Sequence, residues 1–293
     1  MSSNQLGSGV SVLNGNLGGS FDILSGSAGE NPRLGIGRRY GGAVAAYSLR
    51  DIGAEGGRVV NVRRSGDDAN QDFSANQVSS GALAAWVDAG GGDKDGFVEI
   101  WYDQSGNGNN ISQTSADADQ PQIVDNGAVI TDGGNPAIKF NASEFLDVSS
   151  GEIDSSAQFL VVNVTDTASG SRTIMGRKSD TEAFFRITGN DDENYKCDGV
   201  ANTFGLDIKE GSTVIFSVDR DGSNNTKMFE DNTQTGVTKT NVTGDFSFQR
   251  LGARNNAVDP FIGTMSEILM FSGDYSADRE TITLELNAYY GAF

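Results

Sequence analysis

The stretch Trp101-Tyr102-Asp103-Gln104-Ser105-Gly106-Asn107-Gly108-Asn109-Asn110 decides how the middle of this chain folds. The alternating apolar residues of segment 98–101 predict a strand, which ends abruptly in a Gly/Asn turn that needs positive φ angles. Asp103 and Gln104 lie where the strand becomes the turn. Their side chains are placed to hydrogen-bond the backbone amides of the turn itself. We therefore predict a structural turn that includes Asp103, Gln104 and Asn107, with a ligand or metal loop as the alternative.

The composition predicts a globular protein with many turns and no covalent crosslink. The chain has 293 residues with 39 glycines and only 4 prolines, and its 16 phenylalanines can supply a core. This length fits one large sandwich or two small domains. Cys197 is the only cysteine, so no disulfide forms within the chain, and we read it as a small buried or inert residue.

The charge excludes several classes of function. The formal net charge is −19 and histidine is absent, so phosphates of nucleic acids and anionic lipids would be repelled. Catalysis by a Ser-His-Asp or Cys-His arrangement and zinc held by histidine are excluded as well. No apolar run is long enough to span a membrane, and the N-terminus shows no signal-peptide pattern. We expect no nucleic-acid partner and no membrane contact.

Short alternating segments dominate the chain after about residue 40. Turn signals recur about every 8–12 residues, which is typical of an antiparallel β-sandwich. Two short helices are expected, one near Ser80–Ala89 and one over Ser276–Tyr289, with Ser276 as the N-cap candidate. The sequence predicts an all-β, two-sheet antiparallel jelly-roll sandwich over residues 41–293.

Residues 1–40 differ from the rest of the chain. More than half of the first 30 residues are Gly, Ser or Asn, with isolated apolar residues between them. This pattern predicts an extended arm, which becomes ordered only by docking its apolar residues on a surface. The surface is either the chain's own sandwich or a neighbouring subunit. In the second case the arm is an anchor, and we expect a homo-oligomer.

Three segments carry a resemblance to a known family. Ala46-Tyr47-Ser48-Leu49-Arg50, Val62-Arg63-Arg64-Ser65-Gly66-Asp67-Asp68 and the 101–110 turn resemble the catalytic domain of the fungal α-L-arabinofuranosidase B family. The run Gly263–Phe271 with the helix after it resembles the closing elements of concanavalin A-like, laminin-G-type sandwiches. The resemblance covers about residues 43–291, and it implies a concanavalin A-like fold.

The resemblance also implies where a glycosidase site would lie. Aligned by motif, Glu182, or less favourably Asp180, falls near the family's nucleophile. The family's catalytic aspartate falls at Arg254 or Asn255, which cannot donate a proton at neutral pH. Asp259 is the nearest substitute. We therefore expect no catalytic residues, with Glu182 as the nucleophile if the protein is active.

Sugar binding without catalysis needs an aromatic platform and converging polar groups. The candidate ligand-binding residues are Trp86, Tyr195, Arg254 and Asn255, and Tyr195 is expected to be the exposed ring. Trp101 is expected to lie in the core. The acidic loops 117–119 and 190–194 have a composition that suits calcium but lack EF-hand spacing. We assign no metal and no cofactor, with calcium as the alternative.

These features lead to three hypotheses for function. The first is a non-catalytic structural and adhesive component of a phage virion surface, such as a capsid-decorating or fibre protein. Residues 1–40 would anchor it to other virion proteins, and its outward loops would bind a glycan. The second is a glycoside hydrolase acting on arabinofuranosyl side chains. The third is a cell-surface lectin module.

Overall fold

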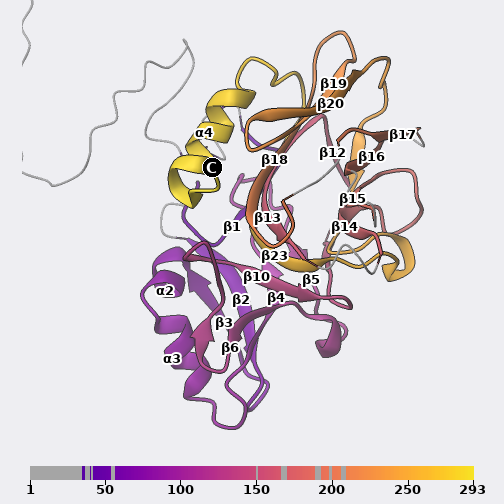
Figure 1. Cartoon of the computed structure of the whole chain (residues 1–293). Helices are drawn as coiled ribbons and strands as arrows, with labels where there is room; N and C mark the ends of the chain where they lie inside the picture. The colour runs from indigo at the N-terminus through magenta and orange to yellow at the C-terminus, as the bar shows by residue number, and fades with distance from the viewer. Residues whose placement is uncertain are drawn as a thin grey trace, which may run out of the picture.

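The computed structural model describes residues 35–36, 40, 42–53, 57–149, 151–165, 170–188, 193–197, 200–205 and 209–293. These residues form an almost wholly β structure with a few short helices, which confirms the predicted antiparallel sandwich (Figure 1). No helix in this part of the chain is both long and apolar enough to cross a membrane.

The elements are short and joined by tight turns. The helices are α2 (Ala75–Ser79), α3 (Ala82–Asp88) and α4 (Arg279–Tyr290), with 3-10 turns η1 (Asp117–Asp119) and η3 (Asn255–Ala257). The strands of the first half are β1 (Ala45–Ser48), β2 (Arg58–Arg64), β3 (Asn70–Ser74), β4 (Gly96–Trp101), β5 (Ile111–Ser112), β6 (Gln122–Asp125), β7 (Ala128–Val129), β8 (Thr131–Asp132), β9 (Asn135–Pro136), β10 (Ile138–Asn141), β11 (Leu146–Val148) and β12 (Ile153–Ser155). Those of the second half are β13 (Ala157–Val164), β14 (Arg172–Gly176), β15 (Phe184–Ile187), β16 (Glu193–Cys197), β17 (Val200–Thr203), β18 (Thr213–Arg220), β19 (Thr226–Glu230), β20 (Thr233–Lys239), β21 (Phe246–Phe248), β22 (Arg250–Leu251) and β23 (Ile262–Phe271).

The pairings define two layers. One layer runs β20-β19-β18-β13-β23, and the free edge of β23 pairs with β1 along one half and with β10 along the other. The other layer runs β17-β16-β15-β14-β22-β11-β5-β4-β2-β3. Strand β6 pairs with both β4 and β10, so it joins the layers at one side. Every one of these pairings is antiparallel.

The main core lies between the two layers. Trp101 is fully buried there, as expected, with its ring centroid 5.8 Å from that of Tyr47. A second apolar cluster lies between the outer face of β13, β18 and β23 and helix α4, where Ile282 and Leu286 pack on Phe159. Figure 1 shows α4 lying over β18. The sandwich therefore has a third, partial layer formed by its C-terminal helix.

The turn after β4 is tied down by its own polar side chains. Asp103 accepts hydrogen bonds from the amides of Ala46, Ser105 and Asn109, each at 2.9 Å. Gln104 is buried, and its side-chain amide contacts three backbone groups of residues 48–52. The expectation that it binds amides of the turn itself was therefore wrong. The Asn107 side chain donates to the carbonyl oxygens of residues 43 and 44. The turn therefore connects β4 to the first strand of the chain.

The helices differ in detail from the predicted ones. Ser74 and Gln77 form a capping box that starts α2, a helix that the sequence analysis missed although the S-x-x-Q pattern marks it. Helix α4 starts at Asp278, not Ser276, so the predicted N-cap was wrong. The Ser276 hydroxyl donates instead to Asp274 in the preceding turn, at 2.6 Å.

Most of the predicted arm lies outside the described residues, but two residues near its end are described. Ile36 and Tyr40 are both buried in the cluster beneath α4. The Tyr40 hydroxyl donates to Glu285 at 2.7 Å, and its carbonyl oxygen accepts from the hydroxyl of Tyr275 at 2.6 Å. These two residues therefore pack on the chain's own sandwich.

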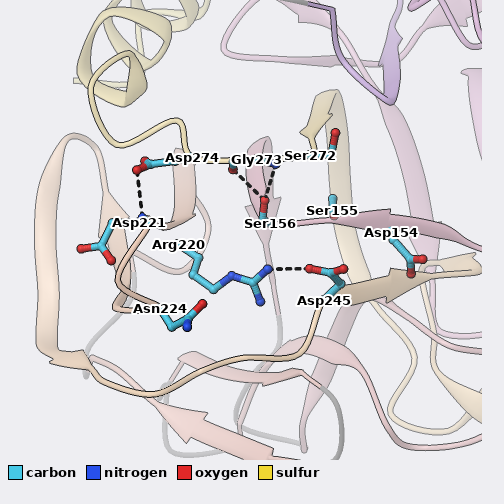
Figure 2. Close-up of a pocket in the computed structure, with 11 residues that line it drawn as sticks. Asp154, Ser155, Ser156, Arg220, Asp221, Asn224, Asp245, Ser272, Gly273 and Asp274 are labelled. Carbon is cyan, nitrogen blue, oxygen red and sulfur yellow. Dashed lines mark hydrogen bonds and ion pairs between the residues drawn. The ribbon is translucent and has the colours of Figure 1, made fainter.

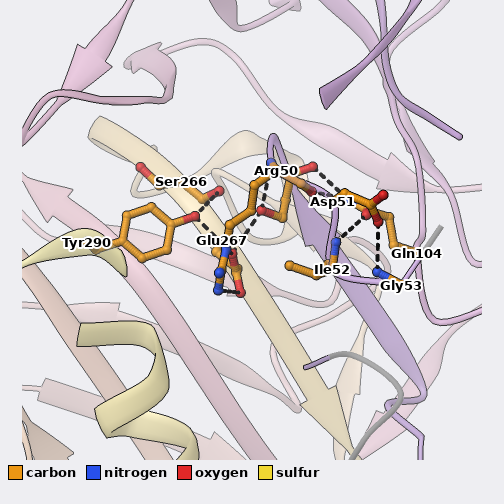
Figure 3. Close-up of polar contacts among 9 residues, drawn as sticks. Arg50, Asp51, Ile52, Gly53, Gln104, Ser266, Glu267 and Tyr290 are labelled. Carbon is orange, nitrogen blue, oxygen red and sulfur yellow. Dashed lines mark hydrogen bonds and ion pairs between the residues drawn. The ribbon is translucent and has the colours of Figure 1, made fainter. Parts of the chain in front are cut away.

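A buried carboxylate joins the first strand, the central strand and the last helix (Figure 3). Glu267 is 0% exposed and accepts hydrogen bonds from the Ser48 hydroxyl (2.8 Å), from Arg50 Nε (2.7 Å) and Nη2 (3.0 Å) and from the Tyr290 hydroxyl (2.9 Å). Burial and the neighbouring carboxylate raise the pKa of Tyr290, which stays a donor. The carboxylate therefore has four donors in place of water.

A β-bulge aims this carboxylate at the helix. The pairing of β13 with β23 shifts between Val161 and Val162, so Ser266 is an extra residue in β23. Met265 before the bulge faces the core between the layers, whereas Leu269 after it packs in the cluster beneath α4. Glu267 therefore lies on the face of β23 that α4 covers, within hydrogen-bond distance of the Tyr290 hydroxyl.

We predict that Glu267→Gln lowers the free energy of unfolding by about 3 kcal/mol, because the partly buried Arg50 loses its counter-charge. Urea denaturation followed by circular dichroism measures this. The matched control Glu280→Gln removes an exposed carboxylate on α4 and should change stability by less than about 0.5 kcal/mol. Equal effects of the two substitutions would contradict the structural role of Glu267.

Candidate functional site

Three neighbouring strands of one layer have ends at the same edge. Ala157, the first residue of β13, lies opposite Asp219 near the end of β18 and opposite Phe271 at the end of β23. The antiparallel register therefore brings three separate loop segments together, which are 154–156, 220–224 and 272–274. They line a cavity of about 280 Å³ (Figure 2).

The walls of this cavity are fixed by short hydrogen bonds. The Ser156 hydroxyl donates to the Gly273 carbonyl oxygen and accepts from the Gly273 amide, both at 2.7 Å. The Asp274 carboxylate accepts from the Gly222 amide at 2.9 Å, which ties the turn after β18 to the turn after β23. The cavity is therefore held open by contacts between loops far apart in sequence.

Arg220 holds the remaining wall. Its guanidinium donates to the carbonyl oxygens of Val242 and Gly244 and forms an ion pair with Asp245. The Arg220 side chain is 15% exposed, whereas that of Asp245 is 56% exposed. The arginine thus positions the loop before β21 while the carboxylate remains open to solvent.

A second cavity, also about 280 Å³, adjoins the first and shares Asp154 and Asp245 with it. Its other walls come from Glu152 and from the β14–β15 hairpin, which supplies Arg177 and Glu182. We call the two cavities together the acidic groove. Asp154 is oriented by the Ser247 hydroxyl at 2.7 Å, and Arg177 pairs with Glu152 at 3.1 Å.

The groove is strongly negative. Two guanidinium groups, of Arg177 and Arg220, face six carboxylates, which belong to Glu152, Asp154, Glu182, Asp221, Asp245 and Asp274. Hydrogen bonds from Asn225 lower the pKa of Asp221, and hydrogen bonds from Ser276 lower that of Asp274, so both stay ionised. Such a groove accepts hydrogen bonds from hydroxyl or ammonium groups and repels anions.

The buried carboxyl of Asp219, beside the groove, has a raised pKa. Asp219 is 2% exposed on the α4 side of β18, and burial raises its pKa to about 6 although Arg279 and Lys227 oppose this. The carboxylates of Asp274 and Asp221, which line the groove, add to the increase. The negative potential of the groove therefore reaches into the layer beneath it.

The two positions that the family resemblance aligned with catalytic carboxyls do not line a common cavity. Glu182 is exposed and lines the second cavity. Arg254 and Asn255 contact each other at 3.2 Å, and Arg254 forms an ion pair with Asp259 at 2.9 Å, but none of these three residues lines either cavity. The possible substitute acid Asp259 is thus committed to an arginine.

The expectation that Tyr195 is an exposed ring was wrong. It is 2% exposed, because side chains alternate along β16 and those of Tyr195 and Cys197 are on the face that packs in the core between the layers. The ring stacks on Phe246 with centroids 5.0 Å apart, and the hydroxyl donates to Gln158 at 2.8 Å. Burial raises its pKa. The polar loop before β16 misled the prediction, since its composition says nothing about the next side chain.

Trp86 lies far along the chain from the other candidates, on α3. It is half-buried, its ring centroid is 5.3 Å from that of Phe73, and the Arg64 guanidinium lies 4.6 Å above it. Trp86 lines neither cavity of the groove. Of the four predicted ligand-binding residues, the structure therefore brings only Arg254 and Asn255 together.

The two loops with a calcium-like composition differ in how well they are described. Segment 117–119 forms the 3-10 turn η1, and Asp117 lies 3.7 Å from Arg63. Most of segment 190–194 falls outside the described residues. Within the described ranges, no group of three or more Asp, Glu or Cys residues is arranged to hold a metal ion.

Comparison with known proteins shows the fold. No family matches the sequence, and no curated protein does. Among solved structures, a GH54 α-L-arabinofuranosidase soaked with a cyclic sulfate inhibitor is 17% identical with a TM-score of 0.59, over 84% of this chain and 63% of that one. A mutant of such an enzyme, soaked with 4-nitrophenyl α-L-arabinofuranoside, is 18% identical with a TM-score of 0.61, over 84% and 63%.

An arabinofuranosidase complexed with arabinofuranosyl-α-1,2-xylobiose is 16% identical with a TM-score of 0.59, over 84% of this chain and 62% of that one. The chain therefore shares the β-sandwich fold of these enzymes and spans less than two thirds of their length. At this level of identity the similarity shows the fold alone.

We predict that Asp219→Asn makes the protein more stable above pH 6 by roughly 2 kcal/mol, since the folded state no longer holds a charged carboxylate in a buried position. Below the pKa of the unfolded chain, about 4, this gain should disappear. Between pH 4 and 6 the folded wild type binds more protons than the unfolded chain, so its stability falls as the pH rises. Urea denaturation of both proteins at pH 4, 5, 6 and 7 measures the difference. A difference that does not change with pH would contradict the raised pKa.

Proposed function

We propose that this protein binds a glycan through the acidic groove and does not cleave it. The observation that carries the proposal is the groove itself, an open polar channel at the edge where β13, β18 and β23 meet. Its carboxylates accept hydrogen bonds from sugar hydroxyls, and the contacts among its walls preorganise them. The sandwich fold shared with arabinofuranosidases supports a ligand of this class by analogy.

We infer that catalysis is absent because the residue expected to act as the acid is replaced and the nearest carboxyl is held in ion pairs. The position that the resemblance aligns with a catalytic aspartate holds Arg254 or Asn255, and neither side chain can give up a proton at neutral pH. The nearest carboxyl, Asp259, pairs with that arginine and with Arg186. A general acid must release its proton to the leaving group. Arg254 does not release its proton, and the carboxyl of Asp259 is held by two arginines.

We predict that the wild-type protein binds neutral arabinoxylan oligosaccharides and that Asp154→Asn weakens this binding about tenfold, because it removes a charged hydrogen-bond acceptor. Isothermal titration calorimetry measures both. Asp125→Asn is the matched control, since Asp125 is an exposed strand residue outside the groove. The proposal fails if no oligosaccharide binds, or if the control weakens binding as much as Asp154→Asn does.

A second candidate function, glycoside hydrolysis, rests on the position of Glu182. This carboxylate lines the same cavity as Glu152, Asp154 and Asp245. A glycosidase needs a pair of carboxyl groups, and this cavity contains more than two. In this alternative Glu182 is the nucleophile and a groove carboxyl, not a residue near Arg254, acts as the acid.

We predict no release of 4-nitrophenol from 4-nitrophenyl α-L-arabinofuranoside by the wild-type protein. The absorbance assay is run beside Glu182→Gln and the control Asp125→Asn. Turnover by the wild type and by the control, but not by Glu182→Gln, would establish the hydrolase in place of the binding protein.

The proposal for where the protein acts and what it is attached to rests on the sequence alone. A virion-surface location, attachment to other virion proteins through residues 1–40 and a homo-oligomer remain part of the proposal. A cell-surface lectin is the alternative setting for the same groove. In both settings the sandwich presents the groove to a glycan, and the arm determines what the protein is attached to.

A further inference from the structure

A second polar cluster lies on the outer face of the other layer. Phe184 of β15 is paired with Lys196 of β16, and Arg186, two residues after Phe184, shares its face of the sheet. The neighbouring residue Phe185 points the opposite way, into the core between the layers. The side chains of Phe184, Arg186 and Lys196 therefore gather on the outward side of this layer.

Three cations surround the Phe184 ring. The guanidinium carbons of Arg186 and Arg254 lie 4.8 Å and 5.8 Å from its centroid, and Lys196 Nζ lies 5.8 Å from it. All three are within the range of a cation–π contact. We call these four residues, together with Asp259, the Phe184 cluster.

One carboxylate within the cluster serves both arginines. Asp259 Oδ2 lies 2.7 Å from Arg186 Nη1, 3.0 Å from Arg254 Nε and 2.9 Å from Arg254 Nη2. The next carboxylate, Asp180, is partly exposed in the β14–β15 hairpin, where it is attracted to both Arg177 and Lys196. The cluster thus keeps an excess of positive charge in a chain whose net charge is −19.

The cations are held in place and still have donors to offer. The arginine side chains are 25% and 18% exposed, for Arg186 and Arg254. Lys196 makes no ion pair within the described part of the chain, so its ammonium group can still donate hydrogen bonds to a ligand. Planar guanidinium groups fixed on one carboxylate and one ring are preorganised to bind a second oxyanion.

The backbone beneath the arginine is held in a costly conformation. Asn256, Ala257 and Asp259 have φ angles of 53°, 52° and 50°. Such left-handed positions cost free energy in residues other than glycine and often occur at binding sites. Here they bring Asp259 back to Arg254 five residues earlier in the chain.

We infer that the Phe184 cluster binds the carboxylate of an acidic sugar. This inference rests on the proposed glycan binding and adds the substrate class, which is a glycan that carries a uronic acid. The charges also set the orientation of the bound glycan, since the acidic groove repels the carboxylate that the Phe184 cluster attracts. The neutral part of the ligand is left for the groove.

The test compares trigalacturonate with its fully methyl-esterified form by calorimetry at low salt. The wild type should bind the acid about tenfold more tightly than the ester, as expected for a charge-assisted hydrogen bond. Arg254→Gln and Arg186→Gln should each abolish the preference. Lys196→Gln, on the sheet surface, should reduce it without disturbing the fold, which circular dichroism checks.

The matched control is Lys239→Gln. Lys239 Nζ lies 5.6 Å from the centroid of the Phe204 ring and is not part of the Phe184 cluster. The substitution therefore removes a lysine–aromatic contact and leaves the proposed binding site intact. It should retain the tenfold preference. Equal binding of acid and ester by the wild type overturns the inference and leaves glycan binding standing. If neither compound binds, the inference fails, and the arabinoxylan titration alone decides whether the protein binds a glycan. If Lys239→Gln weakens the preference as much as Arg254→Gln, the effect is general charge attraction and the inference is wrong.

Discussion

The structure depends on one buried charge. Glu267 sits in the middle of the central strand with no exposure to solvent, where an isolated carboxylate would be unstable. It is tolerated because Ser48, Arg50 and Tyr290 supply four hydrogen bonds from the first strand and the last helix. A chain without a disulfide thus fixes β1 and its C-terminal helix to the central strand by a polar contact, and α4 can cover an apolar face of the sheet.

That arrangement also builds the groove. Strand β23 is fixed on one side by β13 and on the other by β1 and β10, so the position of its last residue is determined. The turn that follows, with Asp274, meets the turn after β18 and the segment before β13. The negative charge of the chain, which excluded nucleic acids at the sequence level, is thereby concentrated around the groove. The positive Phe184 cluster is centred on β15 and β16, next to the β14–β15 hairpin that supplies Glu182 to the groove.

The candidate site was only partly accessible to sequence reasoning. Asp103 was identifiable because it accepts from amides of its own turn, whereas the partners of Gln104 and Asn107 lie more than fifty residues earlier in the chain and were not predicted. Tyr195 was misjudged, since the face of β16 that packs against the other layer is set by the arrangement of the two layers and not by the composition of the preceding loop. Arg254 was identified only as one of two residues that stand where the family has its catalytic aspartate. Its neighbours Phe184 and Arg186 could not be found, because they lie about 70 residues earlier in the chain.

By itself, the sequence determined the class of fold and the chemistry that is excluded. Period-two alternation, glycine-rich turns, the lack of histidine and the charge of −19 are local or additive properties, and they do not depend on which strands pair. Only the tertiary structure decided where the carboxylates meet. Asp154, Asp221 and Asp274 belong to segments separated by more than fifty residues, and the antiparallel register of β13 with β18 and β23 places them around one cavity. No local pattern specifies such a register, because it is set by the packing of the whole sheet.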